Sequence, residues 1–384
     1  MQINKGERLL DNTKSKSEML FYLGYFLALV ASFLKHSMIE IPNSVSIYLN
    51  VMSIFIVSFF LLIRGLKKDY FMETLFLVTI SIFSFLSIKN IDIVSYIFII
   101  IASQHLEFKK IMQFFFTVIF ICLMVVIFLA KLSIIPNLIF YQSDRVRVSL
   151  GTIYPTVLAS YFFFLILSYL LVREKKVLWI ELLIIFLLNL WVLKLTDARS
   201  SFLNTTILLI GVSTMKLIRY NLKASKLMRI ILRSSVVGVP LLVIYLSYNY
   251  RTDSQLYHFL NNALTGRLFY ANKAFYMYNI NLFGQDILMN GSGRNSLYGH
   301  EYFYLDSLAI EQMFSKGLVL LTFYIGATYK ILKKFLDNNK WTYAFVLLII
   351  TLYDITDNKS FRISFNPMLL ALFATVDEYG GDDE

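Results

Sequence analysis

Long uninterrupted apolar runs are the feature that most limits what this chain of 384 residues can fold into. Several runs are long enough to cross a hydrocarbon layer about 30 Å thick, and they lack the alternation with polar residues that surface helices of soluble proteins show. Hydrophobic residues make up 58% of the sequence and charged residues only 16%, which is too few for a soluble globule. The sequence therefore predicts an all-α, polytopic integral membrane protein with membrane lipid as its solvent.

The apolar runs predict about twelve transmembrane helices. The expected spans are Met19–Leu34, Val45–Ile63, Phe71–Ile88, Ile91–Ser103, Ile111–Ala130, Thr152–Val172, Val177–Leu193, Ser200–Ile218, Ile230–Tyr248, Leu308–Ile331, Trp341–Tyr353 and Phe361–Val376. Two of them, Ile91–Ser103 and Trp341–Tyr353, are shorter than the roughly 17 residues that a perpendicular span needs. The chain divides accordingly into a tail (1–18), helices (19–250), one long polar loop (251–306), further helices (307–376) and an acidic tail (377–384).

Lysine and arginine gather in every second connection between the expected spans. These basic connections are residues 64–68, 109–110, 173–176, 216–233 and 330–340. Cytoplasmic loops are enriched in Lys and Arg, so the alternation predicts that both termini lie in the cytoplasm. The net charge of +11 is explained by these orientation signals and does not indicate binding of nucleic acid. The single cysteine, Cys122, allows neither a disulfide framework nor a Cys-based metal site.

The other connections carry more arginine than lysine, although positive charge is selected against on the outer side. These outer arginines are Arg145, Arg147, Arg199, Arg251, Arg267, Arg294 and Arg362. A planar guanidinium can bind phosphate or carboxylate through two parallel hydrogen bonds, which an ammonium cannot. Two interpretations remain open. The arginines bind an anionic substrate, or they pair with lipid headgroups and with nearby acids such as Asp144, Asp197 and Asp253.

Three stretches in the second half of the chain carry motifs. The first is KLTDARSSFL, Lys194 to Leu203, at the outer end of the eighth expected span. It fits the pattern T-x-S-R-x-x-x-L through Thr196 and Arg199, and it departs from that pattern at Ala198, where a small hydroxyl residue or glycine is usual.

The other two stretches lie in and after the long loop. Leu264 to Asp286 contains a Gly-Arg pair, an aromatic amphipathic segment and a later glycine; the matching residues are Gly266, Arg267 and Gly284. Gly291 to Val319 contains a G-x-G turn, a histidine, and an acid followed by a glycine at the next span; the matching residues are His300, Asp306 and Gly317. In this order around one long outer loop, the stretches resemble the O-antigen ligase and polymerase superfamily, specifically the Wzy-like oligosaccharide repeat-unit polymerases.

The resemblance implies a GT-C-like glycosyltransferase in the bacterial cytoplasmic membrane, with its active site on the outer face. It implies transfer of a growing glycan from undecaprenyl diphosphate to a hydroxyl of the next lipid-linked repeat unit. The product would be a capsule, an exopolysaccharide or an O-antigen. The substrate is then an undecaprenyl-diphosphate-linked oligosaccharide, no cofactor is expected, and a chain-length regulator and a flippase of the same pathway are further partners.

The chemistry assigns roles to the motif residues. Arg199 and Arg267 are expected to clamp the diphosphate and to stabilise the charge that develops on the departing oxygen, without a metal ion. His300 is the expected base, and Asp306 either orients it or is the base itself. The alternatives are that His300 only bonds to backbone and that Asp306 caps the following helix. The expected substrate-binding residues are Arg145, Arg147, Thr196, Arg251, Arg294, Tyr298 and Tyr304.

Two other functions and one other role for the loop remain open. A ligase would use the same chemistry with another acceptor. A transporter, such as a flippase for the lipid-linked unit, would need charges within its spans and repeated halves. The expected spans are nearly free of charge, with Glu181 and Lys316 the main candidates, which favours the transferase. The many aromatic residues of the long loop either stack on sugars or anchor an amphipathic helix at the membrane surface.

Overall fold

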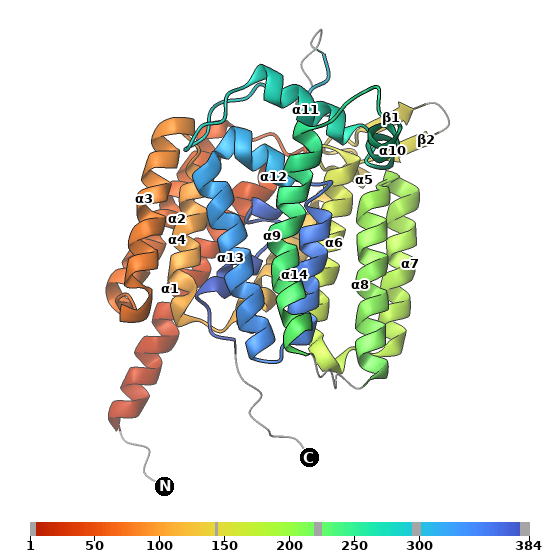
Figure 1. Cartoon of the computed structure of the whole chain (residues 1–384). Coiled ribbons are helices and arrows are strands. Elements are labelled where there is room, and N and C mark those ends of the chain that lie inside the picture. Colours follow the sequence, from red (N-terminus) through yellow and green to blue (C-terminus); the bar gives the residue numbers. More distant parts are fainter. Residues whose placement is uncertain (1–4, 143–144, 219–224, 294–300, 377–384) are drawn as a thin grey trace.

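The computed structural model describes residues 5–142, 145–218, 225–293 and 301–376, which form a bundle of helices (Figure 1). Within these residues, seven helices are long and apolar enough to cross a membrane. They are α1 (Lys5–Leu34), α2 (Asn43–Arg64), α3 (Phe71–Ile88), α5 (Phe108–Lys131), α6 (Pro155–Arg173), α7 (Trp179–Thr196) and α9 (Lys226–Tyr248). The expectation of a helical membrane protein is confirmed at this level.

Four further helices complete the bundle. They are α4 (Ile91–Ala102), α8 (Arg199–Leu217), α13 (Leu318–Asp337) and α14 (Trp341–Tyr353). Helices α4 and α14 are apolar but short, as expected for these two runs, whereas α8 and α13 have 19 and 20 residues with more polar side chains. Successive helices run in opposite directions, so the bundle has two ends (Figure 1). We call the end that carries residues 249–293 and 301–307 the loop end, and the end where α1 begins the opposite end.

Short elements cover the loop end. Two antiparallel strands, β1 (Ile139–Gln142) and β2 (Arg145–Val148), lie in the connection between α5 and α6. Helices α10 (Gln255–Ala263) and α11 (Arg267–Met277) lie across the loop end (Figure 1). The second expected role of the long loop, an amphipathic helix at the surface, fits α10, which exposes large apolar side chains such as Phe259.

The predicted helix over Leu308–Ile331 is wrong, because the chain breaks at Gly317. Helix α12 (Leu308–Glu311) continues as a π-helical turn over Gln312–Lys316, and α13 begins after the glycine. Gly317 has φ of 94°, and a Cβ atom there would lie 2.3 Å from the Leu282 carbonyl oxygen. Glycine is therefore required where the long loop crosses the chain. An apolar run cannot reveal such a crossing, since hydropathy does not report backbone contacts.

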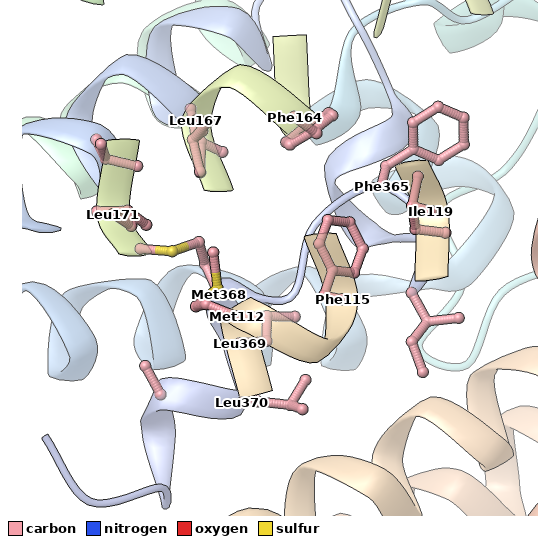
Figure 2. Close-up of a cluster of buried hydrophobic side chains, with 14 of the residues drawn as sticks. Met112, Phe115, Ile119, Phe164, Leu167, Leu171, Phe365, Met368, Leu369 and Leu370 are labelled. Atoms are coloured by element: carbon pink, nitrogen blue, oxygen red, sulfur yellow. The ribbon is translucent and has the colours of Figure 1, made fainter. Parts of the chain in front are cut away.

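The predicted transmembrane helix over Phe361–Val376 is also wrong. One short 3₁₀ turn, Lys359–Phe361, leads into the segment, and a second, Met368–Leu372, lies within it; irregular backbone joins them. It runs through the interior of the bundle, where its side chains pack between α5 and α6 (Figure 2). The packed side chains are Met112, Phe115 and Ile119 of α5, Phe164, Leu167 and Leu171 of α6, and Phe365, Met368, Leu369 and Leu370 of the segment.

Side chains from the surrounding helices satisfy the backbone of this segment. The Tyr96 hydroxyl donates to the Asn366 carbonyl (2.6 Å), the Ser103 hydroxyl to the Leu370 carbonyl (2.9 Å), and Lys334 Nζ to the Ala371 carbonyl (3.0 Å). Irregular backbone at membrane depth is tolerated only where protein supplies such partners. The Asn366-Pro367 step opposes a helix. The segment is therefore buried because it is apolar, but it is not helical.

Candidate functional site

The loop end holds the predicted site residues that the structure describes. Arg294, Tyr298 and His300 lie outside the described residues. Arg199 begins α8 and Arg267 begins α11, and both helices begin at the loop end (Figure 1). The two clamp residues therefore lie at the same end of the bundle, as the clamp hypothesis requires. Arg251, which follows α9 at this end, is exposed.

Asp197 gathers two of the predicted arginines at the turn between α7 and α8. The residue has a left-handed backbone with φ of 47° and ends α7. Its carboxylate accepts from Arg145 Nη1 at 2.9 Å and from Arg199 Nε at 3.4 Å. Arg145 and Arg199 are half or more exposed, with 51% and 60% of their side-chain surface accessible, so each can still reach a ligand. Pairing with a nearby acid, which the sequence left open, occurs for both arginines.

Arg147 is held by neutral groups instead. Its Nε donates to the Thr196 carbonyl at the end of α7 (2.7 Å), and its Nη1 donates to the Tyr154 hydroxyl (3.1 Å), whose ring it also covers. Thr196 itself is fully buried, and its hydroxyl donates to the Val192 carbonyl. Thr196 therefore supports the turn that carries Asp197 and has no accessible surface for a substrate.

Arg267 and Asp306 come together across the long loop. Arg267 Nε lies 3.5 Å from Asp306 Oδ2, although 39 positions separate them in the sequence (306 minus 267). The residue that caps α12 is Ser307, so the alternative that Asp306 caps this helix is not what the structure shows. Burial raises the pKa of Asp306 above its usual value, and Arg267 opposes this rise. The raised pKa of Asp306 brings its proton exchange closer to neutral pH, as a catalytic base requires.

Two tyrosines of the long loop lie in this region, and one of them neighbours the pair. Tyr302 interacts electrostatically with Asp306 and Arg267, and burial raises the pKa of its hydroxyl so that it stays protonated. The Tyr302 hydroxyl also interacts with Tyr154, the residue that Arg147 covers. Tyr304 packs against Gly291 of the G-x-G turn, where an added Cβ would lie 3.1 Å from the ring. The loop residues therefore connect the Arg267 pair with the Arg147 region.

A buried polar centre beneath the loop was missed by sequence reasoning. Lys359 Nζ and Asp357 Oδ2 form an ion pair of 2.6 Å, with side-chain exposures of 9% and 8%. The same carboxylate oxygen accepts from the Tyr353 and Ser160 hydroxyls, each at 3.1 Å. The sequence predicts no site residue in the connection between the expected spans Trp341–Tyr353 and Phe361–Val376. Its high density of charges between two short apolar runs was the available signal.

This polar centre lies between the arginines around Asp197 and the Arg267–Asp306 pair. From α8, the Ser200 hydroxyl contacts the Thr356 hydroxyl, and the Ser201 hydroxyl lies 3.1 Å from that of Tyr353. On the loop side, Lys359 and Asp357 both act electrostatically on Asp306. The arginines of the first motif and the Arg267–Asp306 pair therefore flank one shared polar region at the loop end.

No cluster of three or more His, Cys, Asp or Glu side chains arranged to hold a metal ion occurs within the described residues. Comparisons of the chain with protein-family models, with curated proteins and with solved structures find no match.

Proposed function

We propose that this protein is a membrane glycosyltransferase that polymerises undecaprenyl-diphosphate-linked oligosaccharide repeat units into a surface polysaccharide. The observation that carries the proposal is that residues of three separate motifs meet at one end of the bundle. Arg267 of the second motif pairs with Asp306 of the third at 3.5 Å, and Ser200, beside Arg199 of the first, contacts the same polar region. Three stretches spaced along the chain thus contribute to one site, as a shared active site requires.

The chemistry of the proposed reaction needs cations and a base. The acceptor hydroxyl oxygen attacks the anomeric carbon from the face opposite the diphosphate, so the configuration inverts. The lipid diphosphate leaves with the bonding electron pair, and the acceptor proton passes to the base. Arg199 and Arg267 stabilise the negative charge on the leaving group. Such guanidinium groups can do this without a metal ion.

Asp306 and His300 are the candidate bases. Asp306 pairs with Arg267. A bound diphosphate competes for that guanidinium and releases the Asp306 carboxylate, whose raised pKa suits it to accept a proton. Substrate binding and activation of the base are thereby linked through one arginine.

The proposed setting is the bacterial cytoplasmic membrane, with twelve membrane crossings, both termini in the cytoplasm and the loop end outside. The crossing through residues 361–376 is then non-helical. A chain-length regulator and a flippase of the same pathway are the proposed partners. A ligase that transfers a finished glycan to another acceptor would use the same site.

A transporter of the lipid-linked unit is the second candidate. The observation that favours it is the buried ion pair Asp357–Lys359, since charges inside a bundle commonly mark transport pathways. In a transporter, however, charges must change partners during the cycle, and Asp357 also accepts the Lys359 backbone N–H at 2.9 Å, which fixes the pair locally.

The experiment uses purified protein in nanodiscs with a short-chain lipid diphosphate oligosaccharide. Longer glycans indicate a polymerase, a new acceptor adduct indicates a ligase, and movement across the bilayer without bond formation indicates transport. Replacing Arg267 or Arg199 by Ala is expected to lower turnover about 100-fold, with Lys only partly restoring it. His300→Ala is expected to abolish transfer while substrate still binds. Arg233→Gln, which breaks a pair with Asp337 at the opposite end, is the control and leaves turnover unchanged.

A further inference from the structure

Arg362 is a guanidinium inside the protein that has no carboxylate of its own. It is partly buried, and no acid among the described residues forms an ion pair with it. The nearest acids in its electrostatic surroundings are Glu311 and Asp357, but Glu311 already pairs with Lys316 at 3.6 Å and Asp357 with Lys359 at 2.6 Å. Arginine does not lose its proton in proteins. Glu311 and Asp357 therefore act on Arg362 only at longer range, and no carboxylate among the described residues contacts the guanidinium directly.

His36 holds this guanidinium in place. Arg362 Nη1 lies 2.6 Å from His36 Nε2, while His36 Nδ1 lies 2.7 Å from the Ser32 carbonyl oxygen. A carbonyl only accepts and a guanidinium only donates, so Nδ1 carries the proton and Nε2 is an unprotonated acceptor. The imidazole is therefore neutral, and it directs the guanidinium without adding or cancelling charge. His36 is 7% exposed and immobilised on both sides.

Arg362 lies next to residues of the loop end. Its guanidinium interacts with the hydroxyl of Tyr304 in the long loop. The ring of Tyr304 packs on the G-x-G turn. The His36 carbonyl accepts from the Ile153 N–H at 3.2 Å, so the turn that carries His36 lies beside Tyr154 and its partner Arg147. Arg362 therefore lies close to Tyr304 and Tyr154, and both of these tyrosines interact with Tyr302, which neighbours the Arg267–Asp306 pair.

We propose that Arg362, positioned by neutral His36, binds a phosphate group of the lipid diphosphate. None of the groups that bond to Arg362 is a carboxylate, so a bound phosphate supplies an anionic partner that the described residues do not. Arg362 also donates through Nη2 to Asn358 Oδ1 at 3.5 Å and bonds to the Tyr304 hydroxyl. A guanidinium has five N–H donors, so donors remain for a phosphate oxygen after these bonds and the bond to His36 are made. The inference rests on the proposed function, because the diphosphate is the substrate of that reaction. Arg362 contacts the ligand, and His36 is a positioning residue.

Binding is measured without turnover, so that the inference can be tested apart from the proposed reaction. Protein in phosphatidylcholine nanodiscs is titrated with farnesyl diphosphate, farnesyl monophosphate and, separately, phosphatidylglycerol. Arg362→Gln is expected to weaken diphosphate binding about 100-fold and Arg362→Lys about tenfold, since Lys keeps charge but loses the bidentate geometry. Monophosphate binding weakens less, which separates the two ligands.

His36 variants provide the positioning test. His36→Leu removes the acceptor and is expected to weaken diphosphate binding about tenfold. His36→Gln, whose Oε1 can accept from Arg362, restores binding to within about threefold. In the turnover assay, His36→Leu raises KM for the lipid diphosphate more than it lowers kcat. Arg233→Gln at the opposite end is the matched control and binds as the wild type does.

Three results would overturn the inference. One is unchanged diphosphate binding in folded Arg362→Gln and His36→Leu proteins, and another is a loss confined to phosphatidylglycerol, which would assign Arg362 to lipid headgroups. The third applies if these variants do not fold: a cryo-EM map of the wild type with farnesyl diphosphate is then determined. A phosphate out of hydrogen-bonding reach of Arg362 in that map would contradict the inference. Arg362-dependent binding without glycan elongation would refute the proposed function while supporting this binding role.

Discussion

Replacing Lys359 by methionine is expected to leave a carboxylate without its cation inside the bundle. Lys359 Nζ lies 2.6 Å from Asp357 Oδ2, and both side chains are less than a tenth exposed. Methionine fills a similar volume but carries no charge. The perturbation therefore tests whether the buried polar centre is held together by this ion pair.

The magnitude follows from what remains around Asp357. Removal of one partner of a buried ion pair costs about 3–5 kcal/mol. In Lys359→Met the carboxylate keeps the Tyr353 and Ser160 hydroxyls and the backbone N–H of residue 359, so we expect the lower end, about 3 kcal/mol. Combining the change with Asp357→Asn removes the uncompensated charge. The double variant should lose only about 1 kcal/mol.

The free energy of unfolding is measured by steric trapping in bicelles for both single variants and for the double variant. Glu107→Gln is the control, because its pair with Lys110 is exposed (42% and 55%) and should contribute less than about 0.5 kcal/mol. A loss below about 1 kcal/mol in Lys359→Met, or a double variant equal to the sum of the single variants, would refute the reasoning.

Three further predictions concern individual residues at the loop end. Gly317→Ala should destabilise the protein by about 3 kcal/mol in the same unfolding assay, because its Cβ would lie 2.3 Å from the Leu282 carbonyl at a φ of 94°; unchanged stability would contradict the crossing. Transfer should decline as pH falls through the raised pKa of Asp306, since a base must be ionised, and Asp306→Asn should remove this limb from a pH–rate profile. Burial lowers the pKa of His36 from 6.5 to about 3, so the unfolded state binds the extra proton between these values. Stability should therefore be full above pH 6.5 and fall towards pH 3 by up to about 1.4 kcal/mol per pH unit, and His36→Gln should flatten this slope in thermal melts.

Most of the bundle could be predicted from the sequence because hydropathy reports burial in an apolar environment. The expected spans from Met19 to Tyr248 each correspond to a helix. Hydropathy says little about backbone conformation once a segment is surrounded by protein. Residues 361–376 are as apolar as a span, yet Asn366, Pro367 and donors on neighbouring helices stabilise an irregular path. The break at Gly317 depends on a contact with a distant loop, which no local pattern contains.

The sequence predicted the site residues that lie in local motifs. It did not predict the residues whose role depends on their burial in the folded chain. Arg267 and Asp306 were both selected, and they form a pair. The arginine preference on the outer side did not distinguish Arg199, which pairs with Asp197, from Arg362, which forms no ion pair among the described residues and is influenced by acids only at longer range. That distinction depends on which acids are already paired, and pairing is a property of the folded chain. His36 was not considered, because a lone histidine beside a span resembles many structural ones.

The central claim is that guanidinium groups at the loop end bind a lipid diphosphate. The most direct measurement is photocrosslinking of purified wild-type protein with a polyprenyl diphosphate that carries its photoreactive group beside the phosphates, followed by mass spectrometry of the peptides. Adducts are predicted on peptides from residues 145–154, 197–201 or 264–306, and an excess of inorganic pyrophosphate should suppress them. Adducts confined to the opposite end, near Arg64, Arg173 or Arg233, would contradict the account.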